Sequence, residues 1–220
     1  MPQFLTHCRG FFLLVSYVIY GLKAINISLG VKSPIIFLLF ISYIYSKKGS
    51  ELMENNRAIL PYNANAAIAY AKKWSLLRNP MYLDFTEIGG DCTNFISQCL
   101  YAGSHIMNYT PITGWYYRNA NDRSASWTGV KFLHRFLTTN KGSGPFGKEV
   151  DMNSIVPGDV IQLGNELDDY YHSLLVLQTT PYPTFDKILI ATHSYDAIDR
   201  PLSTYQFYKI RFIHIEGVRT

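Results

Sequence analysis

The stretch Gly89-Gly90-Asp91-Cys92 leads a cysteine into the start of a helix, and this feature constrains the fold most. Apolar residues follow the cysteine at helical spacing, at Phe95, Ile96, Cys99 and Leu100. Unpaired backbone N–H groups at a helix start stabilise a thiolate and lower the pKa of its cysteine. The two glycines permit a tight turn and leave the sulfur open to a substrate. The sequence therefore predicts an exposed, activated thiol at Cys92.

Residues on both sides of this stretch extend the pattern over most of the chain. They are Tyr62-Asn63, Ala66-Ala67, Tyr70-Ala71, Trp74 and Asn79-Pro80-x-Tyr82 before it, and Trp115-Tyr116, Ser126-Trp127, Pro157-Gly158-Asp159, His172-Ser173 and Thr192-His193 after it. The pattern resembles the bacterial putative amidase domain family, which is allied to the NlpC-like and CHAP cell-wall hydrolases, and it covers most of residues 61–215. The resemblance implies a papain-like core and cleavage of an amide bond in peptidoglycan.

The order of the expected elements predicts an α+β fold with helices before an antiparallel sheet. Helical spacing covers residues 64–77, with Asn63 as a cap, and residues 128–139. A loop is expected at residues 141–145. Alternating or continuous apolar runs then predict strands at residues 160–163, 172–179, 187–192 and 205–215. A nucleophile on a helix and histidines on strands are typical of the papain-like arrangement.

Two histidines at strand ends are the candidates for acid–base chemistry. His172 follows a polar loop and begins a strand, so we expect it to be the general base that takes the Cys92 proton. His193 ends the next strand. If the two strands form a hairpin, His193 lies beside His172 and orients its ring. The resemblance agrees, because the third polar residue of NlpC-like enzymes is often a histidine. Asp196 is the alternative orienting residue.

Two residues near the cysteine have supporting roles in this interpretation. Tyr82 precedes the nucleophile, as does a tyrosine in NlpC-like enzymes whose hydroxyl points at the thiol or oxyanion. It could equally be a core aromatic. Asp91 is acidic and directly precedes Cys92, and on a turn it is expected to cap the helix.

An aromatic segment without periodicity lies between the two expected helices downstream of the cysteine. Residues 102–126 are rich in Gly, Asn, Tyr, Ser and Arg. A long segment of this kind is either a substrate-binding loop or a packed surface loop. We expect Trp115 to be a wall of the substrate pocket, with Tyr116 beside it.

The cysteines favour nucleophilic chemistry over a disulfide framework or a metal site. The chain has three, Cys8, Cys92 and Cys99, and the last two lie two helical turns apart, too far for a disulfide within a regular helix. One cysteine and two histidines could in principle hold zinc, but a fourth ligand at a typical zinc spacing is missing. We therefore expect no metal and no cofactor.

The first fifty residues differ in character from the rest of the chain. Residues 11–22 and 34–46 are uncharged apolar runs flanked by lysines and an arginine, and a membrane anchor over residues 11–46 is one interpretation. The catalytic domain, residues 53–220, would then be extracytoplasmic. Alternatively translation starts at Met53, residues 1–52 are not made, and the enzyme is soluble and cytoplasmic. The net charge of +4 is modest and no basic cluster marks a nucleic-acid face.

These observations predict a cysteine amidase or peptidase that acts through an acyl-enzyme on peptidoglycan peptide or another amide. Cys92 would attack, His172 would transfer the proton and His193 would orient His172. Two alternatives remain open. One is a transglutaminase-like acyltransferase with the same Cys-His core, and the other is a wall-binding module without activity.

Overall fold

The computed structural model describes residues 39, 42–45 and 57–220. Contacts divide the chain into two units, Met1–Asn56 and Arg57–Thr220. Of the first unit, Leu39 and residues 42–45 are described, and they are helical. The expected apolar runs at residues 11–22 and 34–46 otherwise lie outside the described residues. Within the described ranges, no helix has both the length and the apolar character that crossing a membrane requires.

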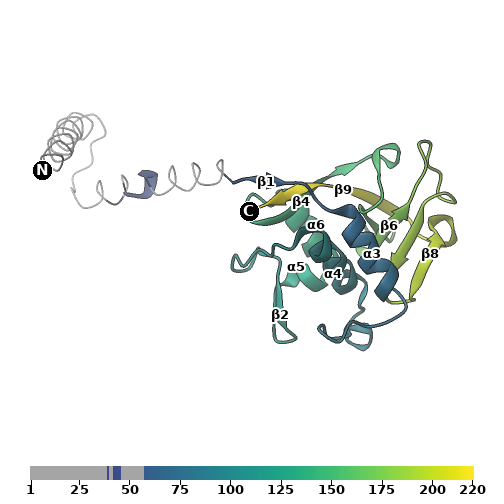
Figure 1. The fold of residues 1–220 in the computed structure, drawn as a ribbon, viewed down its shortest axis with the longest axis horizontal. Helices are drawn as coiled ribbons and strands as arrows, with labels where there is room; N and C mark the ends of the chain where they lie inside the picture. Colours follow the sequence, from purple (N-terminus) through teal and green to yellow (C-terminus); the bar gives the residue numbers. More distant parts are fainter. Residues whose placement is uncertain (1–38, 40–41, 46–56) are drawn as a thin grey trace, which may run out of the picture. The chain divides into compact units, whose positions relative to one another are not determined.

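The second unit begins with a short strand and then carries its helices, labelled as in Figure 1. The helices are α3 (Ala64–Trp74), α4 (Cys92–Ser104), α5 (Ala125–Thr128) and α6 (Val130–Thr139), with short 3₁₀ turns at Thr86–Ile88, Met152–Ser154 and Leu202–Thr204. Asn63 caps α3 as expected, because its side-chain oxygen accepts a hydrogen bond from the backbone N–H of Ala66 at 3.0 Å. The helices predicted from hydrophobic periodicity are confirmed, although α3 ends earlier than predicted.

The strands form one antiparallel sheet and one small hairpin. The sheet strands are β1 (Ile59–Leu60), β4 (Gly144–Val150), β5 (Val160–Gly164), β6 (Tyr170–Gln178), β7 (Leu189–Thr192), β8 (Ala197–Pro201) and β9 (Lys209–Arg219). Their order is β1-β9-β5-β6-β7-β8, and β4 also pairs with β9. The hairpin joins β2 (Tyr117–Asn119) to β3 (Asp122–Arg123). The predicted α+β class with an antiparallel sheet is thus confirmed.

Strand β4 was expected to begin as a loop, and its glycines explain the difference. Gly144 has a φ of +98°, a value typical of glycine in turns, and yet β4 starts at this residue. The β4–β9 pairing contains a bulge between Phe146 and Gly147. A Cβ at Gly147 would lie 2.1 Å from the carbonyl oxygen of His214, so glycine allows the two backbones to approach. The glycines that suggested a loop therefore mark a bulged strand.

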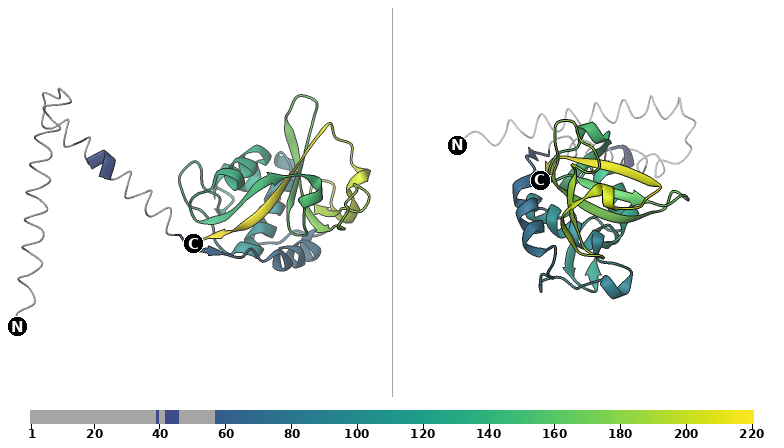
Figure 2. Two further views of the ribbon diagram at one scale, coloured as in Figure 1. Left: turned by 90° about the horizontal axis from the view of Figure 1, so that it is seen from above. Right: turned by 90° about the vertical axis from the view of Figure 1, so that its right-hand side faces the viewer.

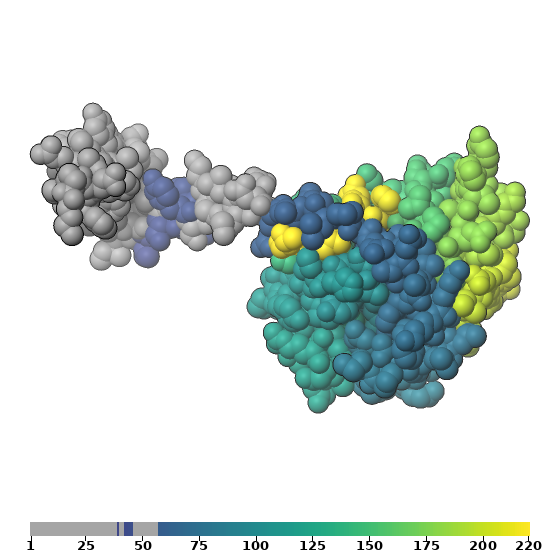
Figure 3. Space-filling model, in the orientation of Figure 1, coloured from purple at the N-terminus to yellow at the C-terminus, as the bar shows by residue number. Residues whose placement is uncertain are grey.

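The sheet separates two apolar cores. One lies between the helices and the sheet and includes Phe95, Trp127, Leu133, Leu175 and Ile213. The other covers the opposite sheet face and includes Ile161, Leu163, Leu174, Ile190 and Leu202. The views of Figure 2 show the helices gathered on one side of the strands. In the space-filling view, blue and teal residues of this helical half fill most of the visible face beside the later strands (Figure 3).

Candidate active site

Cys92 is the first residue of α4, but its thiol is not the exposed group that the sequence predicted. Its exposed fraction is only 7%. Burial is the main cause that raises the pKa of the Cys92 thiol, and the Asp91 charge raises it further. Hydrogen bonds from the Ser173 backbone and from Thr93 act in the opposite direction. The prediction of an exposed, activated thiol is wrong for this conformation, because desolvation outweighs the helix start.

The sulfur of Cys92 lies against strand β6. The Ser173 backbone lies close enough to lower the pKa of the thiol, and the Thr93 hydroxyl lies 3.8 Å from the sulfur. The Ser173 hydroxyl in turn lies 3.0 Å from the Thr93 hydroxyl, which joins the first turn of α4 to β6. Ser173 is the residue directly after His172, so the strand that contacts the sulfur also carries the expected base.

His172 is the third residue of β6, and its imidazole is buried without a partner for one nitrogen. Nε2 forms no hydrogen bond within the described residues. The ring centroid lies 5.9 Å from that of Tyr205. Burial lowers the pKa of His172 to about 4, with a smaller contribution from the Arg200 charge. The imidazole is therefore neutral at pH 7 and can accept a proton. No hydrogen bond joins it to the Cys92 sulfur in this conformation of the described residues.

His193 was expected to orient His172, but it has different partners. Its Nδ1 lies 2.5 Å from Asp91 Oδ2, and its Nε2 lies 2.9 Å from the carbonyl oxygen of Trp74. Its ring stacks on Phe95 with centroids 4.0 Å apart. Both nitrogens are thus occupied, and neither contacts His172.

The strand register explains why the two histidines do not meet. Strands β6 and β7 pair as predicted, with Leu175 opposite Ala191. Continuing this register by two residues sets His193 opposite Ser173. Because successive side chains in a strand alternate between faces, His172 then points to the other face of the sheet. In agreement, His172 pairs with Leu163, a residue of the second core.

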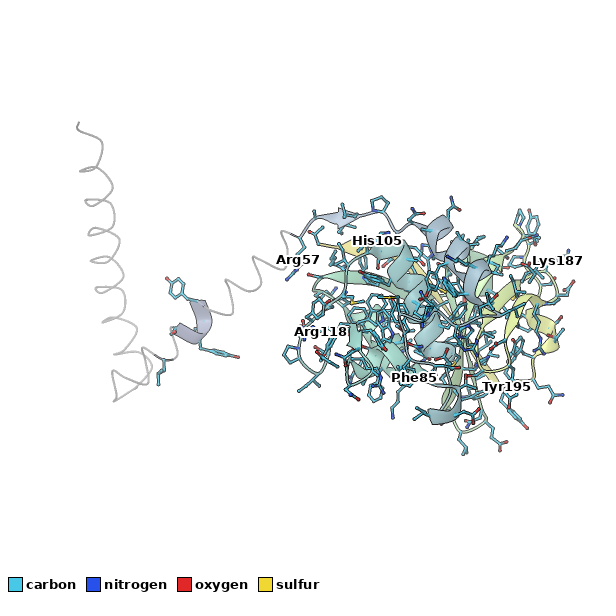
Figure 4. The ribbon with its side chains drawn as sticks, turned by 60° about the horizontal axis from the view of Figure 1, so that its bottom comes forward. Arg57, Phe85, His105, Arg118, Lys187 and Tyr195 are labelled. Atoms are coloured by element: carbon cyan, nitrogen blue, oxygen red, sulfur yellow. The ribbon has the colours of Figure 1, made fainter. Side chains whose placement is uncertain are left out.

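Asp91 was expected to cap α4, but its side chain forms no capping hydrogen bond. Instead it joins several segments of the chain. Besides His193, its carboxylate accepts hydrogen bonds from the Phe85 backbone at 2.9 Å and the Asn94 side chain at 2.8 Å. Its own N–H donates to Ser194 Oγ at 2.6 Å. Figure 4 labels Phe85 and Tyr195, which lie on the two loops that reach Asp91, the second beside Ser194. Asp91 therefore fixes the turn before Cys92.

The glycines in this turn fit the role expected from the sequence. Gly89 and Gly90 have φ of +107° and +102°, values that other residues rarely adopt. A Cβ at Gly90 would also lie 3.3 Å from Ser194 Oγ. The turn that delivers Cys92 to the helix start thus depends on glycine at two successive positions.

Asp196 was suggested to orient the general base and Tyr82 to support the thiol or oxyanion, and the structure gives both residues other partners. Both carboxylate oxygens of Asp196 accept hydrogen bonds from Arg78, at 2.8 and 2.9 Å, so Asp196 is not bonded to either histidine. Tyr82 packs on Tyr117 and Trp127 with centroids 5.1 and 5.8 Å apart. Burial raises the pKa of Tyr82 to about 12. Its hydroxyl forms no hydrogen bond with a described residue. Tyr82 therefore packs against the core, which was the alternative to a role at the thiol.

Trp115 was expected to be a pocket wall, and this prediction is wrong. Trp115 is fully buried, stacks on Phe136, and donates from Nε1 to Ser97 Oγ at 3.0 Å. Tyr116 is partly buried and packs on Tyr109, with centroids 5.2 Å apart. The aromatic composition of residues 102–126 therefore serves packing. A large tryptophan gains more free energy in the core than on a loop.

An open pocket that the sequence did not indicate lies beside His172. Its volume is about 570 Å³, and its lining residues are Asn165, Tyr171, Tyr205, Gln206, Phe207 and Tyr208. Tyr171 precedes His172, and Tyr205 packs near the His172 ring. The segment 205–208 was expected to belong to a strand, but β9 begins only at Lys209, and all four residues of the segment line the pocket. In the described part of the chain, no group of three or more His, Cys, Asp or Glu residues could hold a metal ion.

Comparisons with known proteins agree with the sequence pattern. The family model described as "Putative amidase domain" matches residues 61–216. The chain is 33% identical over 136 residues to the uncharacterized protein YhbB of Bacillus subtilis (strain 168). That alignment covers 60% of this chain and 42% of YhbB, so the chain spans less than half the length of this relative. No solved structure matches the chain.

Proposed function

This chain belongs to the putative amidase domain family, and from that premise we propose that it is a cysteine-dependent hydrolase of amide bonds with a papain-like core. Cys92 is the nucleophile and His172 the general base. The natural substrate is a peptide amide of peptidoglycan, as the resemblance to NlpC-like and CHAP hydrolases implies. The domain is held at a membrane through residues 11–46, or is soluble and cytoplasmic if translation starts at Met53.

One observation carries the proposal. The Ser173 backbone lies against the Cys92 sulfur and favours its thiolate, and Ser173 directly follows His172, whose Nε2 is buried and unpaired within the described residues. A buried polar atom without a partner costs about 1–3 kcal/mol, and such atoms are retained where function requires them. In this proposal His172, on the strand that contacts the sulfur, is such a case. At rest, Nε2 has no hydrogen-bond partner among the described residues. In the proposed reaction it accepts the proton of the Cys92 thiol.

The protonation states define the order of events. Burial raises the pKa of Cys92 and lowers that of His172 to about 4, so the resting pair is a neutral thiol and a neutral imidazole. As the sulfur attacks the substrate carbonyl carbon, its proton passes to His172. The resulting imidazolium then protonates the leaving amine, which breaks the C–N bond and leaves a thioester on Cys92. Water, deprotonated by His172, hydrolyses the thioester and restores the thiol.

Backbone groups around the sulfur support this chemistry. In this proposal the N–H of Cys92 at the helix start donates to the oxyanion that forms during attack. The His193–Asp91 pair acts one step further out. The pair holds the turn before Cys92 against the end of β7. In this proposal it positions the nucleophile and does not itself contact a reacting atom.

Digestion of purified peptidoglycan, followed by mass analysis of the fragments, tests the proposal. The full chain should release fragments with new amino groups, and Cys92→Ser should release none. Cys99→Ala is the matched control, because Cys99 lies on the same helix and is fully buried away from the sulfur's partners. It should retain activity. Equal fragment release by Cys92→Ser would refute the cysteine mechanism.

The same digestion separates the two alternatives. An acyltransferase would attach an added amine to the acyl group in preference to water, which appears as a mass shift of the product. A wall-binding module would retain peptidoglycan binding and release no fragments in either form. Either result would replace the hydrolase proposal.

A further inference from the structure

The pocket beside His172 has walls of one chemical kind. Four of its six lining residues are aromatic, Tyr171, Tyr205, Phe207 and Tyr208, and the other two are the amides Asn165 and Gln206. None is charged. Its volume of about 570 Å³ falls within the usual range for small-molecule sites, about 300–1,000 Å³. A ligand here would meet ring faces and neutral hydrogen-bonding groups.

Charges near the pocket are already engaged. Lys209 follows Tyr208 and forms an ion pair with Asp168. The Arg200 guanidinium lies over the Tyr205 ring, 4.1 Å from its centroid, and donates to Thr204 Oγ1 at 2.7 Å. A phosphate or carboxylate would therefore find no available cation in the lining. A neutral ligand fits this electrostatic setting better than an anion does.

Several polar groups at the pocket are available to a ligand. Asn165 Oδ1 accepts from the backbone N–H of Leu167 and Asp169, which leaves its NH₂ group unbonded. The Gln206 side chain forms no hydrogen bond within the described residues. The Tyr205 hydroxyl is buried and lies beside the Arg200 guanidinium, so Tyr205 contributes its ring rather than its hydroxyl to the pocket.

Flat apolar faces combined with neutral donors and acceptors match a pyranose ring. A sugar has an apolar C–H face that packs on aromatic rings, and hydroxyl groups at its edge. An acetamido substituent would pair with the Asn165 and Gln206 amides. Tyr208 is 76% exposed, so its ring is available without rearrangement of the core. We propose that this pocket binds a neutral N-acetylated saccharide.

The position of the pocket connects this site to the proposed chemistry. Tyr171 is adjacent to His172 in the chain, and the Tyr205 ring lies 5.9 Å from the His172 ring. A saccharide in the pocket would lie next to His172, the proposed general base. That connection rests on the proposed function, whereas saccharide binding does not require Cys92 and can be measured without turnover.

Calorimetric titration of the full chain tests the proposal. Cys92→Ser is titrated with the N-acetylglucosamine trimer, up to about 10 mM because single-site carbohydrate binding is weak. We expect saturable binding. Tyr208→Ala in the same background should weaken it about tenfold, because the substitution removes one of the ring faces on which the sugar packs. Tyr182→Ala is the matched control, with a tyrosine that is 87% exposed and outside the lining, and it should bind like its parent.

Three outcomes would overturn the saccharide site. They are the absence of saturable binding, equal binding by Tyr208→Ala, and binding of trialanine that Tyr208→Ala abolishes. The failure of the proposed function looks different. In that case the trimer binds with the same sensitivity to Tyr208→Ala, and Cys92→Ser digests peptidoglycan as well as the parent chain does.

Discussion

Asp91 and His193 form a fully buried pair whose Oδ2 and Nδ1 atoms lie 2.5 Å apart, although 102 residues separate them in the chain. Each side chain is 1% exposed. The pair joins the turn before Cys92 to the end of β7, and the second histidine nitrogen reaches the Trp74 carbonyl at the end of α3. Three segments that surround the nucleophile thus meet at one imidazole.

Removal of one member of this pair should destabilise the domain strongly. His193→Ala leaves the Asp91 carboxylate buried without its partner, which typically costs about 3–5 kcal/mol of the free energy of unfolding. Urea unfolding monitored by tryptophan fluorescence measures the loss. His134→Ala is the control, because His134 pairs with Glu149 at the surface and should cost about 0–1 kcal/mol. Equal losses would contradict the structural role of the buried pair.

His172→Ala should affect turnover far more than folding. General-base catalysis contributes about 10²–10⁴-fold, so amide cleavage should fall by that factor. Its free energy of unfolding should change little, because the substitution also removes the unpaired Nε2. Turnover and urea unfolding are measured on the same preparation. A loss of stability as large as that of His193→Ala, with turnover retained, would contradict a catalytic role.

The lowered pKa of His172 predicts how stability depends on pH. The unfolded imidazole titrates near 6.5 and the folded one at about 4, so the unfolded chain binds more protons between these values. Stability is therefore complete above about pH 6.5 and falls as the pH decreases toward 4. The His172 contribution over this window is about 3 kcal/mol.

Comparison with a variant isolates this contribution from other titrating groups. The difference in free energy of unfolding between pH 7 and pH 4.5 should be smaller for His172→Ala than for the parent chain. An identical pH dependence in both would show that the imidazole is not desolvated in the folded state.

Thiol labelling should separate the two described cysteines by rate and by pH. Burial raises the pKa of Cys92, so iodoacetamide should label it slowly near pH 7 and faster as the pH increases above 9. Cys99 is fully buried in the core and should remain unlabelled in the folded chain. Mass spectrometry of the peptides gives both rates. Fast labelling of Cys92 at pH 6 would instead indicate a preformed thiolate–imidazolium pair.

Trp115→Ala should act on stability and leave saccharide affinity unchanged. The side chain is fully buried and its Nε1 donates to Ser97, so its removal creates a cavity that typically costs about 3–5 kcal/mol. Denaturant unfolding gives the loss, and titration with the N-acetylglucosamine trimer below the unfolding transition gives the affinity. A normal free energy of unfolding with lost binding would restore Trp115 as a pocket wall.

Local patterns in the sequence predicted the elements well and the side-chain partnerships poorly. Helix α4, its cysteine and the glycine turn follow from residues close together in the chain, where spacing and turn chemistry decide the structure. The β6–β7 hairpin was predicted as well. The face on which each histidine lies was not, because a one-residue difference in position reverses the direction of a strand side chain.

Burial was the second quantity that the sequence could not supply. A cysteine at a helix start has a lowered pKa if water reaches it and a raised one if packing excludes water, and packing depends on distant strands. The same holds for Trp115, which the sequence places in a polar loop and the fold places against Phe136. Sequence pattern gives the type of residue, whereas its environment depends on tertiary contacts.

The pairing of β1 with the end of β9 determines how this domain would respond to force. Ile59 lies opposite Arg219 and Leu60 opposite Val218, so the entry and exit of the domain are at the same end of one strand pair (Figure 1). The carbonyl of Ala58 also accepts from the N–H of Thr220, and Arg57 donates to the Thr220 carbonyl. Tension applied to the two ends would therefore open these bonds one after another, as in unzipping. Shear, in which all the bonds of the pair bear the load together, would require the ends to lie at opposite ends of the strands.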